Sequence, residues 1–424
     1  MVGLADCNNF FVSCERSVRP ELDCVPMVVL SNNDGCVVAR SNEAKRMGVK
    51  MGQPAFEIRA LIRSGKILAY SGNHLLYREK SLKVHDIFRR FVPETMDYSV
   101  DESFLIVDGI PEKMLPVIGE AIYTECWQKE RIPVTIGFAP TKTLAKIAAE
   151  TGKKAGQRVL VMSRTEEFEP LFDKMPIYDL WGVGRRLAKR LYSNGVFTIG
   201  DFLRKPKAWV RGQLGVHGEK SWLELHGVPC IELSHLARKM QDSISETRTF
   251  PEDVDDFDYL RSRIAIYCGH VSKQLRAMEG ACGEVTVFLR TNRFHLEKGI
   301  YTPEASAQFL TPTDDVAVIT TAAVDCLEKI YNRAFRYKRL GVVLSKIVQR
   351  QSVTRSLFEE IDPSNAGTVR SRRLMEAIDR INEGVADHVV KLASQLTKGH
   401  SGHNDGYSSS FGSPKHEKED SPVD

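Results

Sequence analysis

Three acidic residues stand at the ends of short apolar runs, and this arrangement limits the folds open to the chain. Residues 2–5 (VGLA) form an apolar run of strand length that stops at Asp6. Asp101 and Glu102 lie between two apolar flanks within residues 96–109. Because a carboxylate beside a buried strand costs free energy unless something compensates it, these acids need partners. We expect residues 96–109 to form a hairpin or bent strand with the acidic pair at its turn.

The three acids suit a particular chemistry if they converge. Carboxylates brought together from two strands repel one another, and divalent cations relieve that repulsion. Mg²⁺ prefers hard oxygen ligands, and two such ions can activate an attacking hydroxyl and stabilise a leaving pyrophosphate. The positions of these acids in the sequence are equally consistent with three unrelated surface acids at strand ends, because neighbouring Asp and Glu residues are common.

The N-terminal third mixes strands and helices without strict alternation. We predict further strands over residues 26–30 and 133–139, and helices over residues 41–47, 77–91 and 141–151, the last followed by Lys153 and Lys154. This mixture predicts an α+β unit that ends near Met162.

The rest of the chain divides into a helical stretch and a second α+β unit. Residues 166–236 are predicted to be helical, and the acid-rich residues 246–258 to be a linker or domain entry. The second unit has predicted helices over residues 258–278 and 314–335 and predicted strands over residues 283–291 and 339–348. These strands could form a DNA-facing sheet, because they are flanked by Arg290, Arg293, Arg336, Lys338, Arg339 and Lys346.

Composition places the chain among ordinary globular proteins. It has 424 residues, of which 42% are hydrophobic and 27% charged, enough for about three domains. No apolar run approaches about 18 residues, which predicts no membrane span. Residues 1–9 lack the pattern of a secretory signal, and the nine scattered cysteines predict reduced, buried thiols in a cytoplasmic protein.

The net charge of +4 is the sum of two unequal parts. The last 26 residues, 399–424, carry −3 and are rich in Ser, Gly and His, which predicts a disordered tail. The remaining residues therefore carry +7. This charge fits a nucleic-acid partner, and it also fits ordinary solvated surface charge.

Residues 180–191 (LWGVGRRLAKRL) have the pattern of a helix-hairpin-helix motif. Gly182 and Gly184 would let backbone N–H groups approach a phosphate, and Arg185 and Arg186 would begin a basic helix. Such a hairpin grips a nucleic-acid backbone without reading sequence. An ordinary tight turn between helices has a similar pattern.

Four segments together resemble the Y-family translesion DNA polymerases, in the order of that family's motifs. They are residues 4–11 (LADCNNFF), 98–104 (YSVDESF), 139–146 (APTKTLAK) and 181–185 (WGVGR). Residues 30–40 (LSNNDGCVVAR) resemble the UmuC branch in particular. The resemblance covers residues 1–350 and extends more weakly to residue 398.

The resemblance implies an α+β, multidomain, right-hand polymerase fold. Its parts would be a palm (1–30 and 76–165), small fingers (31–75), a helix-hairpin-helix thumb (166–238) and a little finger (239–350). A C-terminal partner-binding region (351–398) and the tail (399–424) would follow.

The resemblance also implies roles for residues of the active site. Asp6, Asp101 and Glu102 would be the catalytic carboxylates and, with the backbone carbonyl of Cys7, would bind two Mg²⁺ ions. Phe11 would be the steric gate that excludes ribonucleotides, although simple core packing also explains an aromatic residue there.

Nucleotide and DNA contacts follow from the same resemblance. Phe10, Lys45 and Lys153 would bind the nucleotide, and Gly182, Gly184, Arg185 and Arg186 would bind DNA. Lys45 stands where many members have Arg, so it would contact phosphate as a point charge, without Arg's two-pronged geometry. Asn42 stands where many members have Tyr, which weakens the case for that nucleotide contact.

The implied function is an error-prone, DNA-directed DNA polymerase of the SOS response that extends primers past damaged template bases. Its substrates would be primer–template DNA and deoxynucleoside triphosphates, and its partners a UmuD′-like dimer and a RecA filament. Leu357 and Phe358 could end a sliding-clamp peptide, although Thr354 replaces the usual Gln. The helix expected from Arg370 could instead serve the UmuD′-like partner.

Two other functions stay open from the residues alone. A non-catalytic DNA-binding scaffold that recruits SOS repair partners would need the hairpin and the basic surfaces, but not the acids. A palm-type nucleotidyl cyclase would share the acids, but it would not need the hairpin or the basic C-terminal unit.

Overall fold

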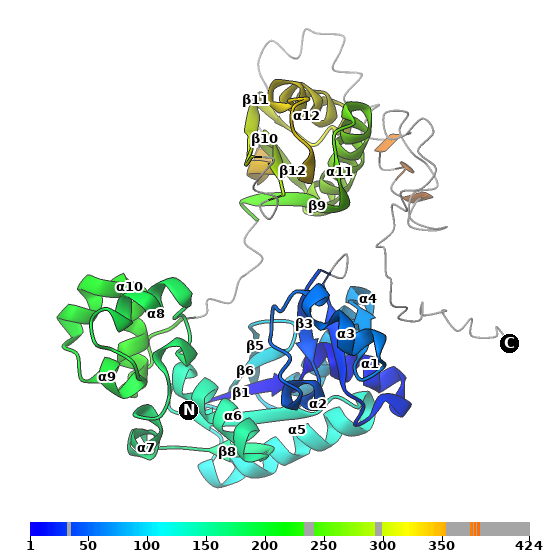
Figure 1. The fold of residues 1–424 in the computed structure, drawn as a ribbon. Coiled ribbons are helices and arrows are strands. Elements are labelled where there is room, and N and C mark those ends of the chain that lie inside the picture. Colours follow the sequence, from blue (N-terminus) through cyan, green and yellow to red (C-terminus); the bar gives the residue numbers. More distant parts are fainter. Residues whose placement is uncertain are drawn as a thin grey trace, which may run out of the picture. The chain divides into compact units, whose positions relative to one another are not determined.

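A computed structural model describes residues 1–31, 35–232, 241–292 and 299–352, and six residues between 374 and 381. The chain divides into two compact units, Met1–Leu236 and Ala237–Asp405, which are described separately below (Figure 1). The predicted clamp residues Leu357 and Phe358, most of the C-terminal region and the predicted tail lie outside the described residues.

The first unit is built on a five-stranded sheet with the order β5-β6-β1-β7-β8. The central strand β1 (Val2–Cys7) runs antiparallel to β6 (Glu102–Ile106) and to β7 (Val134–Ala139). The edge strands are β5 (Glu94–Asp97), antiparallel to β6, and β8 (Val159–Val161), parallel to β7. The predicted hairpin is confirmed, because β5 and β6 are joined by a turn that contains Asp101.

Helices pack on both faces of this sheet. The helices α4 (His74–Phe91) and α5 (Leu115–Glu130) share a hydrophobic cluster with one face, and α1 (Phe10–Val18) joins it. Helix α6 (Lys142–Ala155) packs on the other face through a second cluster.

The period of β1 decides which of its side chains meets which helix. Successive strand residues point to opposite faces. Ala5 and Cys7 therefore join the cluster of α4 and α5, while Val2 and Leu4 join that of α6. Asp6 follows the same alternation and faces α6.

Helix α6 lies unusually close to β7. A Cβ at Gly137 would stand 2.2 Å from the backbone nitrogen of Ala149, so only glycine allows this approach. The helix is also longer than predicted. It continues to Ala155 and ends at Gly156, which adopts a left-handed φ of 71°, so Lys153 and Lys154 lie in its last turn instead of following it.

A smaller sheet with the order β3-β2-β4 completes the strands of the first unit. The predicted strand β2 (Met27–Leu30) pairs antiparallel with β3 (Val37–Arg40) and parallel with β4 (Leu68–Ser71). Two short helices, α2 (Asn42–Arg46) and α3 (Arg59–Arg63), accompany it. These elements have a small hydrophobic core of their own.

The predicted helical stretch is confirmed within the described residues. It contains α7 (Glu169–Phe172), α8 (Arg185–Tyr192), α9 (Ile199–Leu203) and α10 (Lys207–Leu225). Helix α10 is kinked at Gly215, where φ is 70°. These helices share the hydrophobic cluster of α6.

The second unit has a four-stranded antiparallel sheet with the order β11-β10-β12-β9. Its strands are β9 (Ser243–Val254), β10 (Gly280–Thr291), β11 (Glu304–Thr313) and β12 (Tyr337–Gln349). The sequence predicted the β10 and β12 regions.

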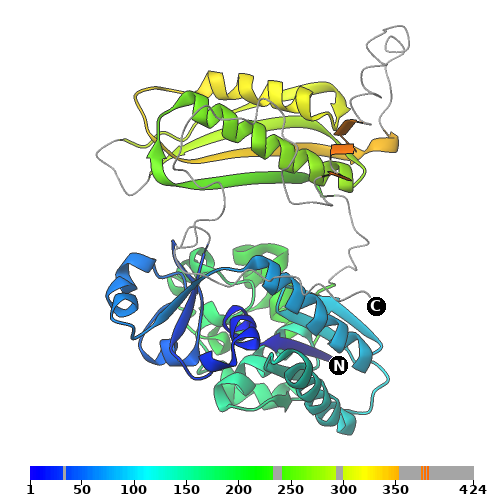
Figure 2. The same ribbon diagram turned by 90° about the vertical axis from the view of Figure 1, so that its right-hand side faces the viewer.

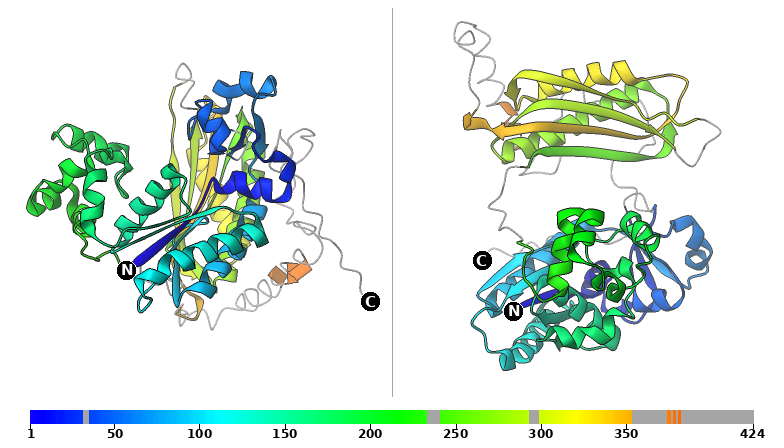
Figure 3. Two further views of the ribbon diagram at one scale, coloured as in Figure 1. Left: turned by 90° about the horizontal axis from the view of Figure 1, so that it is seen from below. Right: turned by 90° about the vertical axis from the view of Figure 1, so that its left-hand side faces the viewer.

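Two helices, α11 (Phe257–Ala277) and α12 (Val316–Ile330), cover one face of this sheet and enclose the core of the second unit (Figure 2). The right-hand view of Figure 3 shows the opposite face, on which the described residues place no helix.

Two elements of the second unit contradict the sequence prediction. The expected acidic linker at residues 246–258 is wrong, because residues up to Val254 belong to strand β9 and bury Ile244 and Phe250. Strand β11 was missed, because its inward positions include the small residues Ala305 and Ala307, which give a weak hydrophobic alternation.

All nine cysteines are free thiols, and six of them are buried. Cys24 is exposed and Cys36 and Cys230 are half-buried, so the prediction of buried thiols is wrong for these three. In the described part of the chain, no helix has the length and apolar character needed to cross a membrane.

Candidate active site

The structure brings the three predicted acids to one place. Asp6 on β1 stands directly opposite Glu102 on β6, so both carboxylates leave the sheet on the α6 face. Asp101 immediately precedes β6, and its carbonyl oxygen accepts a hydrogen bond of 2.9 Å from the backbone N–H of Cys7. Two strand ends that are 95 residues apart in sequence thus meet through backbone pairing.

Asp6 is largely buried and forms an ion pair with Lys153 from the last turn of α6. The pKa of Asp6 is raised to about 7, mainly by burial and also by the negative charges of Glu102 and Asp101, while Lys153 opposes the shift. The net direction is upward, so one lysine does not supply enough positive charge for this group of acids.

Glu102 has a lysine of its own. Lys146 Nζ donates to both carboxylate oxygens of Glu102, at 2.7 and 2.9 Å. Lys146 and Lys153 are seven residues apart, which is close to two helical turns, so one face of α6 presents both. No role for Lys146 was predicted from the sequence, although it ends the motif APTKTLAK.

Asp101 binds a hydroxyl where the other two acids bind lysines. Its carboxylate accepts a hydrogen bond of 2.6 Å from Ser99 Oγ in the same turn. Across the described residues, no three His, Cys, Asp or Glu side chains are arranged together as a ready-made metal site. Each carboxylate has a partner of its own, Lys153 for Asp6, Lys146 for Glu102 and Ser99 for Asp101.

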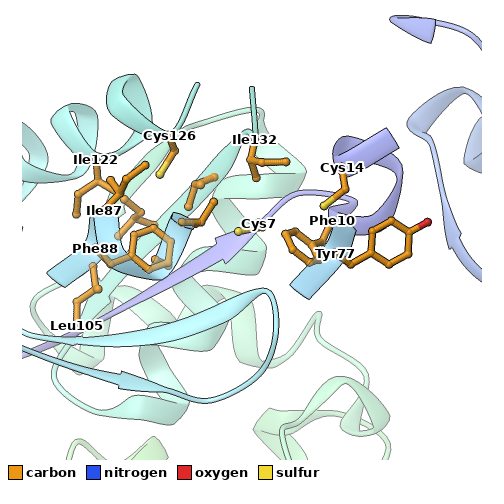
Figure 4. Close-up of a cluster of buried hydrophobic side chains, with 14 of the residues drawn as sticks. Cys7, Phe10, Cys14, Tyr77, Ile87, Phe88, Leu105, Ile122, Cys126 and Ile132 are labelled. Carbon is orange, nitrogen blue, oxygen red and sulfur yellow. The ribbon is translucent and has the colours of Figure 1, made fainter. Parts of the chain in front are cut away.

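Cys7 turns its side chain away from the acids. Its thiol lies in the cluster that includes Phe88 and Ile122 (Figure 4), where burial raises its pKa well above the ordinary value. The thiol is therefore no metal ligand at neutral pH, and only the backbone carbonyl of Cys7 could serve.

The donor set fits divalent cations in its chemistry. Three carboxylates and a backbone carbonyl are hard oxygen donors of the kind that Mg²⁺ binds. The pKa of Asp6 is raised mainly by burial, and the charges of Glu102 and Asp101 add to the shift, so nearby positive charge would stabilise its carboxylate. Bound cations would supply that charge.

A cleft of about 480 Å³ lies next to the last turn of α6; Lys153, the partner of Asp6, lines it, but none of the three acids does. It brings together the predicted nucleotide residues Lys45 and Lys153 with further basic and polar groups, but neither Phe10 nor Phe11 lines it. The lining residues are Asn8, Asn9, Asn42, Lys45, Tyr123, Pro133, Val134, Thr135, Glu150, Lys153, Lys154, Gly156, Gln157 and Arg158.

Asn9, at the start of α1, is hydrogen-bonded to two residues of α2 in this cleft. Lys45 Nζ donates to Asn9 Oδ1 at 2.6 Å, and Asn9 Nδ2 donates to Asn42 Oδ1 at 3.0 Å. Asn9 adopts the left-handed conformation, with a φ of 49°, at the start of α1. Burial lowers the pKa of Lys45, and the charges of Arg40 and Lys153 lower it further. Asn42 thus contributes to positioning Lys45 through Asn9.

The two predicted aromatic residues have different surroundings. Phe10 is buried in the hydrophobic core. Phe11 is only partly buried and stacks on Tyr77, with ring centroids 4.4 Å apart and an interplanar angle of 15°. The Tyr77 hydroxyl donates to the buried Glu15 at 2.6 Å, which fixes the ring beneath Phe11.

The predicted helix-hairpin-helix motif at residues 180–191 has the backbone geometry that its glycines suggested. Gly182 has a φ of 87°, and Gly184 directly precedes α8. A Cβ at either glycine would meet open space, and both residues are exposed together with Arg185 and Arg186. The backbone N–H groups at this helix start are therefore accessible from solvent.

Comparisons with known proteins agree with this arrangement. Residues 5–150 match the model of the impB/mucB/samB family, and residues 241–357 match the C-terminal domain of the same family. The chain is 34% identical to protein UmuC of Salmonella typhimurium over 93% of both chains. It is 33% identical to protein ImpB of Salmonella typhimurium over 90% of both, and 28% identical to DNA polymerase IV of Pelotomaculum thermopropionicum over 93% of this chain and 95% of that protein.

Solved structures share the fold. A Y-family DNA polymerase chimera of Dbh and Dpo4 matches 82% of this chain and 99% of its own, with a TM-score of 0.66 and 22% identity. An insertion ternary complex of Dbh DNA polymerase matches with a TM-score of 0.52 over 82% of this chain and 99% of that chain.

The α+β, right-hand polymerase fold predicted from the motifs is thereby confirmed. Identity above 30% across nearly the whole chain decides the family. The chain belongs to the impB/mucB/samB family, within the UmuC branch of the Y-family of DNA-directed DNA polymerases.

Proposed function

We propose that the chain is an error-prone translesion polymerase of the SOS response, which extends primers past damaged template bases by two-metal nucleotidyl transfer. The observation that carries this proposal is the placement of Asp6 directly opposite Glu102, with Asp101 held beside them through the backbone of Cys7. The proposal further places the chain in the cytoplasm.

Asp6, Asp101, Glu102 and the carbonyl of Cys7 would hold two Mg²⁺ ions. When bound, such ions lower the pKa of the primer 3′-hydroxyl and neutralise charge on the phosphates. The protein's own contribution is to hold the carboxylates on a rigid pair of strands, where backbone pairing fixes their separation. Bound cations would stabilise the ionised form of Asp6, which burial and the charges of Glu102 and Asp101 disfavour.

Lys45 and Lys153 would bind the triphosphate from opposite sides of the cleft. Both already have acceptors, Asn9 for Lys45 and Asp6 for Lys153, so phosphate oxygens would replace those acceptors. Phe11 would lie beneath the sugar and clash with a 2′-hydroxyl. The buried Phe10 would support Phe11, since their ring centroids are 5.8 Å apart.

The hairpin would hold the DNA backbone. Gly182 and Gly184 expose backbone donors at the start of α8, and Arg185 and Arg186 add positive charge there. We also propose the palm, fingers, thumb and little-finger boundaries given above. The UmuD′-like dimer, the RecA filament and the sliding clamp remain proposed partners.

The test is primer extension on a gapped template that carries one abasic site, with and without UmuD′ and a RecA filament. The full chain is expected to insert opposite the site in the presence of Mg²⁺. Asp101→Ala is expected to abolish extension, whereas Asp86→Ala, which changes an exposed acid on α4, is expected to retain it. Unchanged extension by Asp101→Ala would overturn the metal assignment.

The same assay separates the alternatives. A scaffold would bind the gapped DNA but would not extend the primer, and a cyclase would consume nucleotide without any primer. Neither is favoured, because the acids converge and the fold over both units is that of solved polymerases.

A further inference from the structure

Lys146 stands between a proposed catalytic carboxylate and two aromatic rings. Its ammonium donates to both oxygens of Glu102. The same ammonium lies 5.0 Å from the ring centroid of Tyr98 and 5.7 Å from that of Trp181. Both distances are within the range of cation–π attraction, so the rings hold the ammonium without competing for its hydrogen bonds.

The two rings are 83 residues apart in the sequence and contact each other. Trp181 Nε1 donates to the Tyr98 hydroxyl at 2.9 Å, and the rings meet edge to face at a centroid distance of 5.4 Å. Both also contact the fully buried Phe104 of β6. Tyr98 precedes the acidic turn, and Trp181 directly precedes Gly182 of the hairpin.

We propose that Lys146, Tyr98 and Trp181, here called the lysine cage, form a positioning unit that couples the hairpin's hold on DNA to the orientation of Glu102. The inference rests on the proposed function, since it assigns Glu102 to the reaction and the hairpin to DNA. A shift of the helix-hairpin-helix motif would move Trp181. Because the Lys146 ammonium contacts both Trp181 and Glu102, a movement of Trp181 would be passed to the Glu102 carboxylate.

Lys153 shows why the cage is distinctive. It pairs with Asp6 on the same face of α6, but no aromatic ring is recorded within cation–π distance of it among the described residues. Lys153 can therefore leave Asp6 for a phosphate, whereas Lys146 is held on several sides. The cage makes Lys146 a fixed support for Glu102.

Single-turnover primer extension tests the coupling. Lys146→Met is expected to slow extension about 100-fold, because a catalytic group displaced by about 1 Å costs that much. Lys146→Arg is expected to restore part of the rate. Trp181→Phe keeps a ring but loses one hydrogen bond, and is expected to slow extension about 5-fold with unchanged affinity for DNA.

Matched variants control for general damage. Lys129→Met removes a surface lysine that pairs with Glu125, and Trp209→Phe changes another tryptophan that lies under a lysine, Lys205. Both are expected to retain the wild-type rate. The double variant of Lys146→Met and Trp181→Phe is expected to be no slower than Lys146→Met alone, because the two residues act through one path.

A second readout needs no catalysis. In protein labelled with ¹³C at the lysine ε-carbon, the Lys146 signal is expected upfield of the other lysines because of the ring currents of Tyr98 and Trp181. It is expected to move on Trp181→Phe and on Glu102→Gln. The wild-type extension assay tests the proposed function separately, so a protein without polymerase activity could still show the cage.

Three results would overturn the inference. One is an unchanged rate for Lys146→Met. Another is a Trp181→Phe variant that loses DNA affinity at an unchanged rate, which would make Trp181 a purely structural support of the hairpin. The third is a Lys146 signal at the position of exposed lysines that Trp181→Phe does not move.

Discussion

Asp6 of the first unit and Glu246 of the second are acids on strands with nearly equal exposure, yet their pKa values move in opposite directions. Their side chains are 17% and 16% exposed, and both have basic partners. Burial raises the pKa of Asp6 to about 7. Burial acts on Glu246 too, but its interaction with His270 and the charge of Arg248 lower its pKa overall.

The difference lies in the neighbouring charges. Glu246 has two bases within reach, Arg248 at 2.7 Å and His270 at 3.7 Å. Asp6 has one lysine and lies near two more acids. In the second unit, two basic side chains offset the charge of the partly buried Glu246. In the first unit, one lysine faces Asp6 and two neighbouring acids, at the strand ends where we propose that cations bind.

The bases beside the strands of the second unit follow the same rule of local balance. Sequence alone suggested that they could make a DNA-facing sheet. Four of the six now have acidic partners, in the pairs Arg290–Glu304, Arg336–Asp255, Lys338–Asp253 and Lys346–Glu284. Arg339 donates to Thr247, and Arg293 lies outside the described residues. Much of this positive charge is therefore already offset within the unit.

The largest effect is expected when the two acids are neutralised in parallel. Asp6→Asn should reduce single-turnover extension by at least about 1,000-fold, because it removes an electrostatic contact to the reacting centre. Glu246→Gln should leave the rate unchanged and lower the free energy of unfolding of the second unit by about 1 kcal/mol. Equal losses of rate in the two variants would remove the distinction between the units.

The next comparison is the loss of stability when a closely packed glycine in each unit is replaced by alanine. Gly137→Ala should cost about 3 kcal/mol, because its Cβ would meet the backbone of α6, which cannot move without shifting Lys146 and Lys153. Gly341→Ala should cost less, about 1–2 kcal/mol, since its Cβ would meet only side chains, the end of the Phe288 ring and the Thr247 methyl group, and no backbone atom. Denaturant unfolding measures both, and a larger loss for Gly341→Ala would contradict this account.

Two aromatic stacks give the next comparison. Phe11→Ala should raise the use of ribonucleotides relative to deoxyribonucleotides about 30-fold, because the proposed clash with the 2′-hydroxyl is removed. Phe335 stacks on Tyr301 in the second unit in similar geometry, at 4.6 Å and 14°. Phe335→Ala should leave nucleotide selection unchanged. No rise with Phe11→Ala would refute the gate.

The smallest effect concerns pH. Burial lowers the pKa of His85 below its ordinary 6.5, so the unfolded chain takes up its proton first and the contribution of His85 to the stability of the first unit is lost as pH falls below about 6.5. The raised pKa of Asp6 acts in the opposite direction between about 7 and its ordinary 3.8, so the comparison is made in an Asp6→Asn background. The lowered pKa of Glu246 gives stability above its ordinary 4.5 that is lost only at more acidic pH. Hydrogen exchange of each unit of the Asp6→Asn variant, from neutral pH to well below 4.5, shows which unit loses stability first.

Single variants assign the two losses. In the Asp6→Asn background, His85→Gln should flatten the loss in the first unit below about pH 6.5, and Glu246→Gln should flatten the later loss in the second unit. If both units lost stability in the same pH range, the two groups would not be responsible.

Local patterns predicted much of the fold and part of the site. The apolar alternation around Asp6 and around the acidic pair indicated the strands, and the run of residues 141–151 indicated α6. Strand β9 was missed because its acids resemble a linker, although their partners, such as Lys338 for Asp253, lie on another strand. Lys146 was missed because nothing near it in sequence reveals its contact with Glu102.

The amino-acid sequence is enough to specify the residue types at the strand ends, the glycines that permit close packing and the order of the family's motifs. The pairing of Lys153 with Asp6, of Lys146 with Glu102 and of Trp181 with Tyr98 arises only when the chain is folded. Strand period and glycine conformations are local properties, whereas the energy of a buried charge depends on every charge within a few ångströms, from segments far apart in the chain.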